Sequence, residues 1–181
     1  LYEEVLLDQQ ILLKKELSQE ELENLYHENK KWESYYQALS ILKKHLKTKK
    51  EIENYLKEKG FTLEEIEKTI QKLTDQGYLN DLNYAKSYVH YKLTTSNHGP
   101  LFIRKELEGK KISKDNIDIA LSVYTKEEEK QKIYKIISTK LKSNHKKSTF
   151  SLRKSLEIYL SREGFCKDLI NEALEKIYVS N

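Results

Sequence analysis

One pattern of apolar residues occurs three times in this chain, and it constrains the fold more than any other feature. The segment "YLKEKGF" at residues 55–61 returns as "YLSREGF" at 159–165. Around both segments, apolar residues follow one another at steps of 4, 5, 5, 4 and 3, and a third copy with the same steps lies midway, around "ELEGKKI" (106–112). The apolar positions are Ile52, Leu56, Phe61, Ile66, Ile70 and Leu73; Ile103, Leu107, Ile112, Ile117, Leu121 and Tyr124; and Leu156, Leu160, Phe165, Ile170, Leu174 and Ile177. A period near 52 residues indicates a repeat architecture.

Each copy has the pattern of two helices joined by a corner. Steps of 4 and 3 place side chains on one helical face, whereas the two steps of 5 around Phe61, Ile112 and Phe165 predict a turn. Gly60 and Gly164 precede two of these residues and suit the left-handed conformation that ends many helices.

Helix start signals and upstream patterns extend each copy to three helices. Capping boxes are predicted for Thr48 with Glu51, Thr62 with Glu65 and Thr125 with Glu128, and Pro100 suits the first turn of a helix. Apolar periodicity predicts a further helix before each pair, at residues 32–46, 81–93 and 126–141. Few segments alternate between apolar and polar residues, so no sheet is predicted in these units.

We therefore predict an all-α protein of three tandem three-helix repeats, forming an elongated, curved helical array with an acidic N-terminal helical extension. The predicted parts are the extension at 1–31 and the repeats at 32–77, 78–124 and 125–181. Because the chain starts at Leu1 and contains no Met, we expect the extension to be truncated.

Charge and composition indicate which repeat is basic and in which compartment the protein is expected. Net charge rises from −4 over residues 1–32 to +5 over residues 125–181, so the third repeat is the basic one. The single cysteine, Cys166, forms no internal disulfide, and no apolar stretch reaches the roughly 20 residues that span a bilayer. We expect a cytoplasmic protein, monomeric and without membrane contact.

Patterns typical of catalysis, cofactors or metals are not found. The five glycines are scattered and form no phosphate loop, and the five histidines lack metal-ligand spacing. Cys166 lacks an identifiable base, which favours a partly buried thiol over a nucleophile. The carboxylates of "LEEIE" (63–67) suit the first turn of a helix better than acid–base catalysis. We predict no cofactor, no metal site and no enzymatic activity.

Two basic segments leave alternatives open. The run "KLKSNHKKSTFSLRK" (140–154) contains no acid, and it is either a solvated surface or a loop that binds phosphates. In "KSYVHYK" (86–92), tyrosines and lysines alternate as they would on a stacking platform for single-stranded bases. However, Tyr84, Tyr88 and Tyr91 are spaced at 4 and 3, which favours a packing stripe.

Several motifs resemble the RecX family of regulators of the bacterial RecA recombinase. "GYLNDLNYAKSYV" (77–89), followed by "GPLFIRKEL" (99–107), resembles the family's central signature. "TKKEIENYLKEKGF" (48–61) resembles the first family repeat and "SLRKSLEIYLSREGF" (151–165) the third. In one departure, the glycine of the middle copy stands at 109, so we expect a differently shaped helix end there.

The resemblance implies a function as well as a fold. Members bind within the helical groove of the RecA filament on single-stranded DNA, where they block filament growth and lower ATP hydrolysis and strand exchange. On this basis we expect the third repeat to face DNA phosphates and the second to contact the recombinase. The candidate DNA- or filament-binding residues are Arg104, Lys105, Lys140, Lys142, Lys146, Lys147, Arg153 and Lys154. Gly77, Tyr78, Leu79 and Ala85 are expected to shape the turn and packing of the second repeat.

Two other classes of function fit the residues alone. One is a helical nucleic-acid-binding adaptor that acts independently of a recombinase, and the other is a helical scaffold with protein partners only. Of these two classes and the RecX-like regulator, only the regulator is predicted to inhibit ATP hydrolysis by recombinase filaments.

Overall fold

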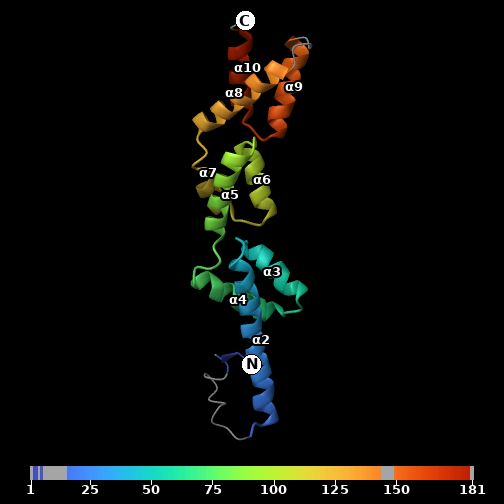
Figure 1. Cartoon of the computed structure of the whole chain (residues 1–181), viewed down its shortest axis with the longest axis vertical. Helices are drawn as coiled ribbons and strands as arrows, with labels where there is room; N and C mark the ends of the chain where they lie inside the picture. Colours follow the sequence, from blue (N-terminus) through green and yellow to red (C-terminus); the bar gives the residue numbers. More distant parts are fainter. Residues whose placement is uncertain (1, 4, 6–15, 144–148, 180–181) are drawn as a thin grey trace. The chain divides into compact units, whose positions relative to one another are not determined.

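The computed structural model of the chain describes residues 2–3, 5, 16–143 and 149–179, in which helices are joined by turns and short loops (Figure 1). The helices in this part are α2 (Gln19–Leu42), α3 (Lys49–Glu58), α4 (Leu63–Asp75), α5 (Asp81–Thr95), α6 (Pro100–Gly109), α7 (Lys114–Leu121), α8 (Lys126–Ser143), α9 (Thr149–Arg162) and α10 (Lys167–Val179). The same residues contain no strand, so the all-α prediction is confirmed.

The chain divides into two compact units, Leu1–Asp81 and Leu82–Asn181. The first contains α2, α3 and α4, and the second contains α5 to α10. Within the described residues, none of the helices is both long and apolar enough to cross a bilayer.

Each group of three consecutive helices encloses its own hydrophobic core. The first core consists of Tyr35, Ala38, Leu39, Ile52, Leu56, Ile66, Leu73 and Leu79. The second consists of Ala85, Val89, Ile103, Leu107, Ile112, Ile117, Ala120, Leu121 and Tyr124. The third consists of Ile133, Ile136, Ile137, Leu152, Leu156, Leu160, Phe165, Leu169, Ile170, Ala173 and Leu174. These separate cores confirm the three-helix repeats.

The apolar positions of the repeat pattern supply most of these core residues. Phe61 and Ile70 are partly buried against the first core, and the side chain of Ile177 lies outside the described ones. The remaining positions are all buried. Burial of one helical face against two neighbouring helices therefore explains the spacing.

The corner between the second and third helix of each repeat has one geometry. An N–H to C=O hydrogen bond closes each corner, from Phe61 to Leu56 (3.2 Å), from Ile112 to Leu107 (3.3 Å) and from Phe165 to Leu160 (3.2 Å). Gly60 and Gly164 have φ angles of 85° and 81°, as expected for the left-handed residue of such a helix end.

The middle corner keeps this geometry without a glycine, contrary to our expectation of a different shape. Gly109 is the last residue of α6, and Lys111 adopts the left-handed conformation with φ 63°. The corner is the same because its closing hydrogen bond needs a left-handed residue, which a lysine can supply at an energetic cost.

The predicted helix starts agree with the structure. Thr48 with Glu51 and Thr62 with Glu65 form complete capping boxes, and Thr125 exchanges hydrogen bonds with Glu128. Pro100 is the first residue of α6.

Two expectations differ from the structure. The first helix of repeat 1 begins at Gln19 and not at 32, because Ser18 and Glu21 form a capping box at that point. The residues of the predicted extension that follow Ser18 therefore belong to the same helix, α2. Leu79 packs in the first core and not in the second, and Tyr78 is exposed, because the left-handed Gly77 turns the chain so that Leu79 reaches back onto α4.

Candidate functional site

The second and third repeats, both within the second unit, meet backbone to backbone. The N–H of Gly99 donates to the carbonyl oxygen of Glu163 at 2.7 Å, and the N–H of Leu101 donates to that of Gly164 at 3.0 Å. A Cβ built on Gly99 would overlap the backbone of Gly164, and one built on Gly164 would overlap that of Phe102. Two glycines therefore permit a contact that no other residue type allows.

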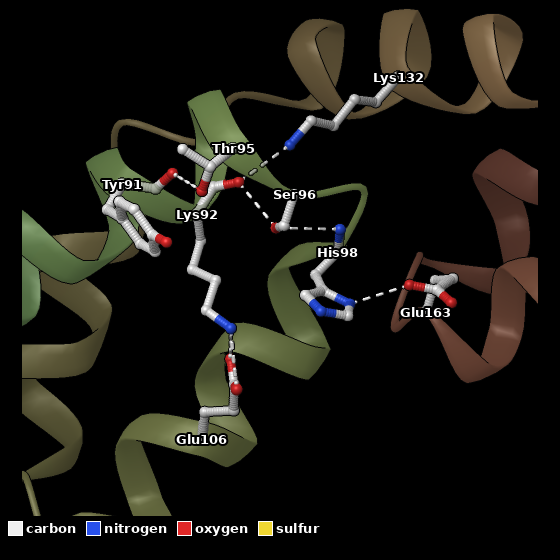
Figure 2. A network of polar contacts seen from close by, with 8 residues as sticks. All are labelled: Tyr91, Lys92, Thr95, Ser96, His98, Glu106, Lys132 and Glu163. Atoms are coloured by element: carbon white, nitrogen blue, oxygen red, sulfur yellow. Dashed lines mark hydrogen bonds and ion pairs between the residues drawn. The ribbon is translucent and has the colours of Figure 1, made fainter.

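His98 adds side-chain contacts to this junction (Figure 2). Its Nδ1 lies 2.9 Å from Oε2 of Glu163. Its ring also stacks on that of Phe102, with centroids 3.8 Å apart. The hydroxyl of Tyr124 donates to the His98 carbonyl oxygen at 3.2 Å. The loop between α5 and α6 is thus fixed to both repeats.

Lys92 anchors the end of α5 beside the same loop. Its Nζ donates to Oε1 of Glu106 at 2.9 Å, and its side chain is only 15% exposed (Figure 2). Burial by itself disfavours the charge of Lys92, but hydrogen bonds with Glu106 and Tyr88 outweigh it and raise the pKa of Lys92. The ammonium group is therefore a fixed internal partner of Glu106.

The carbonyl oxygen of Lys92 receives two further donors. Ser96 Oγ lies 2.8 Å from it, and Nζ of Lys132 reaches it from α8 at 3.5 Å (Figure 2). Because this carbonyl oxygen already accepts the backbone N–H of Ser96 at 3.1 Å, the two side chains add to the hydrogen bonding at the C-terminal end of α5. The network serves to hold two repeats in one arrangement.

The predicted basic residues of the second repeat lie on α6. Arg104 pairs with Asp118 of α7 at 2.5 Å and is 34% exposed, whereas Lys105 is exposed. Arg104 is thus already engaged within its repeat, and Lys105 is the more accessible of the two.

The predicted basic residues of the third repeat divide between α8 and α9. Nζ of Lys140 lies 3.9 Å from the ring centroid of Tyr159, and Lys142 is exposed near the end of α8. On α9, Arg153 is partly buried and Lys154 is exposed. Lys154 also lines a hollow of about 420 Å³ together with Glu157, Ile158, Ser161 and Arg162. Lys146 and Lys147 lie outside the described residues.

The tyrosines of α5 mostly pack. Tyr84 and Tyr88 lie against the second core with their rings stacked at 6.0 Å, whereas Tyr91 is exposed. The packing interpretation is confirmed for the first two.

Cys166 is a partly buried thiol against the third core, as expected. Its carbonyl oxygen accepts from the N–H of Ile170, so it stands at the N-cap of α10, where the first repeat has Thr62. Its own N–H donates to Oε1 of Glu129 at 2.6 Å. Burial raises the pKa of Glu129, against the opposing effects of this hydrogen bond and Lys126.

The first unit contains a cation–aromatic cluster that is not among the predicted site residues. Nζ of Lys72, on α4, lies 3.3 Å from the ring centroid of Trp32 and 4.9 Å from that of Tyr35, both on α2. The aromatic run "WESYY" (32–36) was the available signal, and it was read only as part of a helix. Elsewhere in the described part of the chain, no three His, Cys, Asp or Glu side chains are grouped to hold a metal ion.

Comparison with known families gives two matches in consecutive segments. Residues 35–73 match the first three-helix domain of RecX, and residues 80–121 match its second three-helix domain. The two segments coincide with most of the helices that enclose the first and second cores.

Similar full-length proteins are named regulatory protein RecX. The protein from Bacillus cytotoxicus is 33% identical over 162 residues, which are 90% of this chain and 60% of that protein. The protein from Bacillus subtilis is 31% identical over 167 residues, with 92% and 63% covered. The chain thus spans less than two thirds of the length of these relatives.

Solved structures of RecX proteins have a similar fold. A crystal structure of regulatory protein RecX superposes with a TM-score of 0.86 at 25% identity, covering 96% of this chain and 85% of that one. RecX from Lactobacillus salivarius gives a TM-score of 0.79 at 28% identity, covering 83% and 98%.

Proposed function

Because this chain belongs to the RecX family, we propose that it is an inhibitor of a RecA recombinase that modulates DNA repair and recombination. It binds the recombinase filament on single-stranded DNA and suppresses filament extension, ATP hydrolysis and strand exchange. The observation that carries the proposal is the likeness to regulatory RecX proteins, in sequence over nine tenths of the chain and in fold.

The junction between the second and third repeats supports this proposal. Because the two repeats are joined through their backbones at Gly99 and Gly164, they present their outer surfaces in one fixed arrangement. A ligand that contacts two neighbouring subunits at once loses less freedom on binding when its parts are held together beforehand. The second repeat contacts the recombinase, and the third faces the DNA phosphates.

Inhibition then follows from differential affinity. A ligand shifts a conformational equilibrium only as far as it binds one state more tightly than the other. The protein, acting as a monomer, holds neighbouring subunits in a state that neither extends nor hydrolyses ATP efficiently. The proposal assigns no reaction to this chain itself.

The accessible basic residues are the proposed contacts. Lys105 on the second repeat and Lys142 and Lys154 on the third are exposed. Lys140, Arg153 and Arg104 have partners within the chain, so they contribute charge to the same surfaces without being fully free. Lys146 and Lys147 remain candidates from the sequence.

The test measures ATP hydrolysis by RecA filaments on circular single-stranded DNA as this protein is added. Inhibition at protein amounts well below those of the recombinase is the expected result. Full hydrolysis at every ratio, with tight binding to bare DNA, would instead favour an adaptor that acts without the recombinase. Full hydrolysis without DNA binding would favour a scaffold for other proteins.

Charge-reversal variants distinguish the role proposed for the second repeat from that proposed for the third. Lys105→Glu is expected to weaken inhibition while leaving binding to bare DNA unchanged. Lys154→Glu is expected to weaken both, and its DNA binding should depend less on salt. If Lys105→Glu and Lys154→Glu have indistinguishable effects in both assays, the division of roles between the repeats is wrong.

A further inference from the structure

A groove follows α8 where the second repeat meets the third. One part is a hollow of about 400 Å³, lined by His90, Leu93, Thr94, Glu128, Gln131, Lys132 and Lys135. The other is a hollow of about 460 Å³, lined by Asn97, Lys135, Ile136, Thr139, Lys140 and Tyr159. The two hollows have Lys135 in common, and we call them together the α8 groove.

Positive charge predominates in the α8 groove. Its lining includes three lysines of one helix, Lys132, Lys135 and Lys140, against one carboxylate, Glu128. Lys135 is exposed and makes no ion pair with the described residues. The charge of Lys135 is therefore not neutralised by an ion pair within this part of the chain.

Lys132 shows the electrostatic cost of this arrangement. Burial, and then repulsion from Lys135, lower the pKa of Lys132, while Glu128 acts in the opposite direction. Its Nζ donates to a carbonyl oxygen and lies 5.4 Å from the ring centroid of Tyr124, and none of the described carboxylates is bonded to it. An anion in the groove would relieve this repulsion.

The groove also has apolar and aromatic walls. Leu93 and Ile136 line its two parts, and the ring of Tyr159 stands beneath Nζ of Lys140. A small anion would contact only the lysines and would leave the apolar and aromatic walls without a partner. Single-stranded nucleic acid presents phosphates and unpaired bases together, and proteins that bind it combine a basic groove with side chains on which bases stack.

We propose that the α8 groove binds single-stranded DNA, with Lys132 and Lys135 contacting phosphates and Tyr159 beside a base. The inference rests on the proposed function in one respect, because the strand would be that of the recombinase filament. It adds residues from outside the basic run at 140–154, and it places the strand across the boundary of two repeats. Since α5 and α8 both line the groove, it exists only while the junction at Gly99 and Gly164 is intact.

The test measures binding of a fluorescein-labelled oligothymidine by anisotropy at several salt concentrations, without recombinase. Lys135→Glu is expected to weaken binding about tenfold at low salt, and loss of a phosphate contact lowers the slope of log affinity against log salt by about 0.7. Lys132→Met keeps the packed stem of the side chain and removes the charge, so it should lower the slope in the same way. Lys114→Glu, an equal charge change at an exposed position on α7, is the matched control and should keep the wild-type affinity.

Several outcomes would overturn the inference. One is that the wild-type protein does not bind the oligonucleotide, and another is that the groove variants bind it as tightly as the wild type does. The third is an equal loss of DNA affinity in Lys114→Glu, which would indicate attraction by the overall positive charge of the protein and not by the groove. Far-UV circular dichroism confirms that each variant is folded.

A parallel assay of recombinase ATP hydrolysis distinguishes this inference from the proposed function. If Lys135→Glu binds DNA normally but no longer inhibits, the groove holds a protein partner, and the inference fails while the proposed function stands. If the groove variants lose DNA binding but the wild-type protein never inhibits, the inference stands and the proposed function fails.

Discussion

Gly99 and Gly164 lie against each other across the boundary of the second and third repeats, and neither position has room for a Cβ. The two residues are far apart in sequence and have different backbone conformations, since only Gly164 has a positive φ. The same contact joins two repeats and helps to shape the α8 groove.

Replacing Gly99 with alanine should destabilise the second unit. The new methyl group would overlap the Gly164 backbone, and such overpacking costs about 1–3 kcal/mol. Urea unfolding followed by far-UV circular dichroism measures the loss. Gly109→Ala is the control, because a Cβ there meets no atom within 4 Å and a helical glycine is replaced by a better helix former. Equal stability of Gly99→Ala and the wild type would show that the two repeats can separate freely.

Lys111→Gly should stabilise the second repeat. A left-handed conformation costs a residue with a Cβ roughly 1 kcal/mol, which glycine avoids. Lys111→Ala removes the same side chain but keeps the Cβ, so it should leave the urea midpoint nearly unchanged. Conversely, Gly60→Ala at the equivalent corner should lower the midpoint. A glycine at 111 that stabilises no more than alanine would contradict the role assigned to this conformation.

Stability should depend on pH through Glu129. Burial raises the pKa of Glu129 above the ordinary value of 4.5. At pH values between 4.5 and the raised pKa, the folded protein therefore binds more protons than the unfolded chain. Stability therefore falls as pH rises from below 4.5 through the raised pKa of Glu129. Glu129→Gln keeps an acceptor for the Cys166 N–H but cannot ionise, so the fall should be smaller in this variant.

Urea midpoints over a pH series provide this measurement. Glu127→Gln, at an exposed position on the same turn of α8, is the control and should keep the wild-type profile. Identical profiles for Glu129→Gln and the wild type would mean that Glu129 does not titrate with a raised pKa. Glu129→Ala should also lower stability at all pH values by about 1–3 kcal/mol, because the Cys166 N–H loses its acceptor.

Lys72→Met should change the fluorescence of Trp32 and weaken the first unit. The ammonium group stands over the indole ring, and a cation–π contact of this kind is worth about 0.5–2 kcal/mol. Because Trp32 is the only tryptophan, its emission reports the first unit alone. Lys68→Met, which disrupts an exposed pair with Glu64 on the same helix, is the control and should alter neither stability nor emission. An unchanged spectrum in Lys72→Met would contradict the contact.

Signals from neighbouring residues were sufficient to predict the helices and the corners from the sequence. Capping boxes, the first-turn proline and the left-handed glycines act over a few residues, so Thr48, Pro100 and Gly164 could each be interpreted from their neighbours. The start of α2 is set equally locally, by the capping box of Ser18 with Glu21. The candidate site was less predictable, because exposure and pairing decide which lysines are available. Arg104 turned out to be paired with Asp118, whereas Lys132 and Lys135 had not been singled out.

The sequence by itself determined the three-helix unit, its repetition and the family, because each unit buries one periodic apolar face within about 50 residues of chain. Only the tertiary structure decided how the second and third repeats join and which lysines line a groove between them. That contact brings together Gly99 and Gly164, which lie more than 60 positions apart. Gly164 recurs as Gly60 in the repeat pattern, but Gly99 has no glycine counterpart in it. No local hydrogen bond or spacing specifies such a pair, since it depends on the close approach of the α5–α6 loop and the α9–α10 corner, which belong to different repeats.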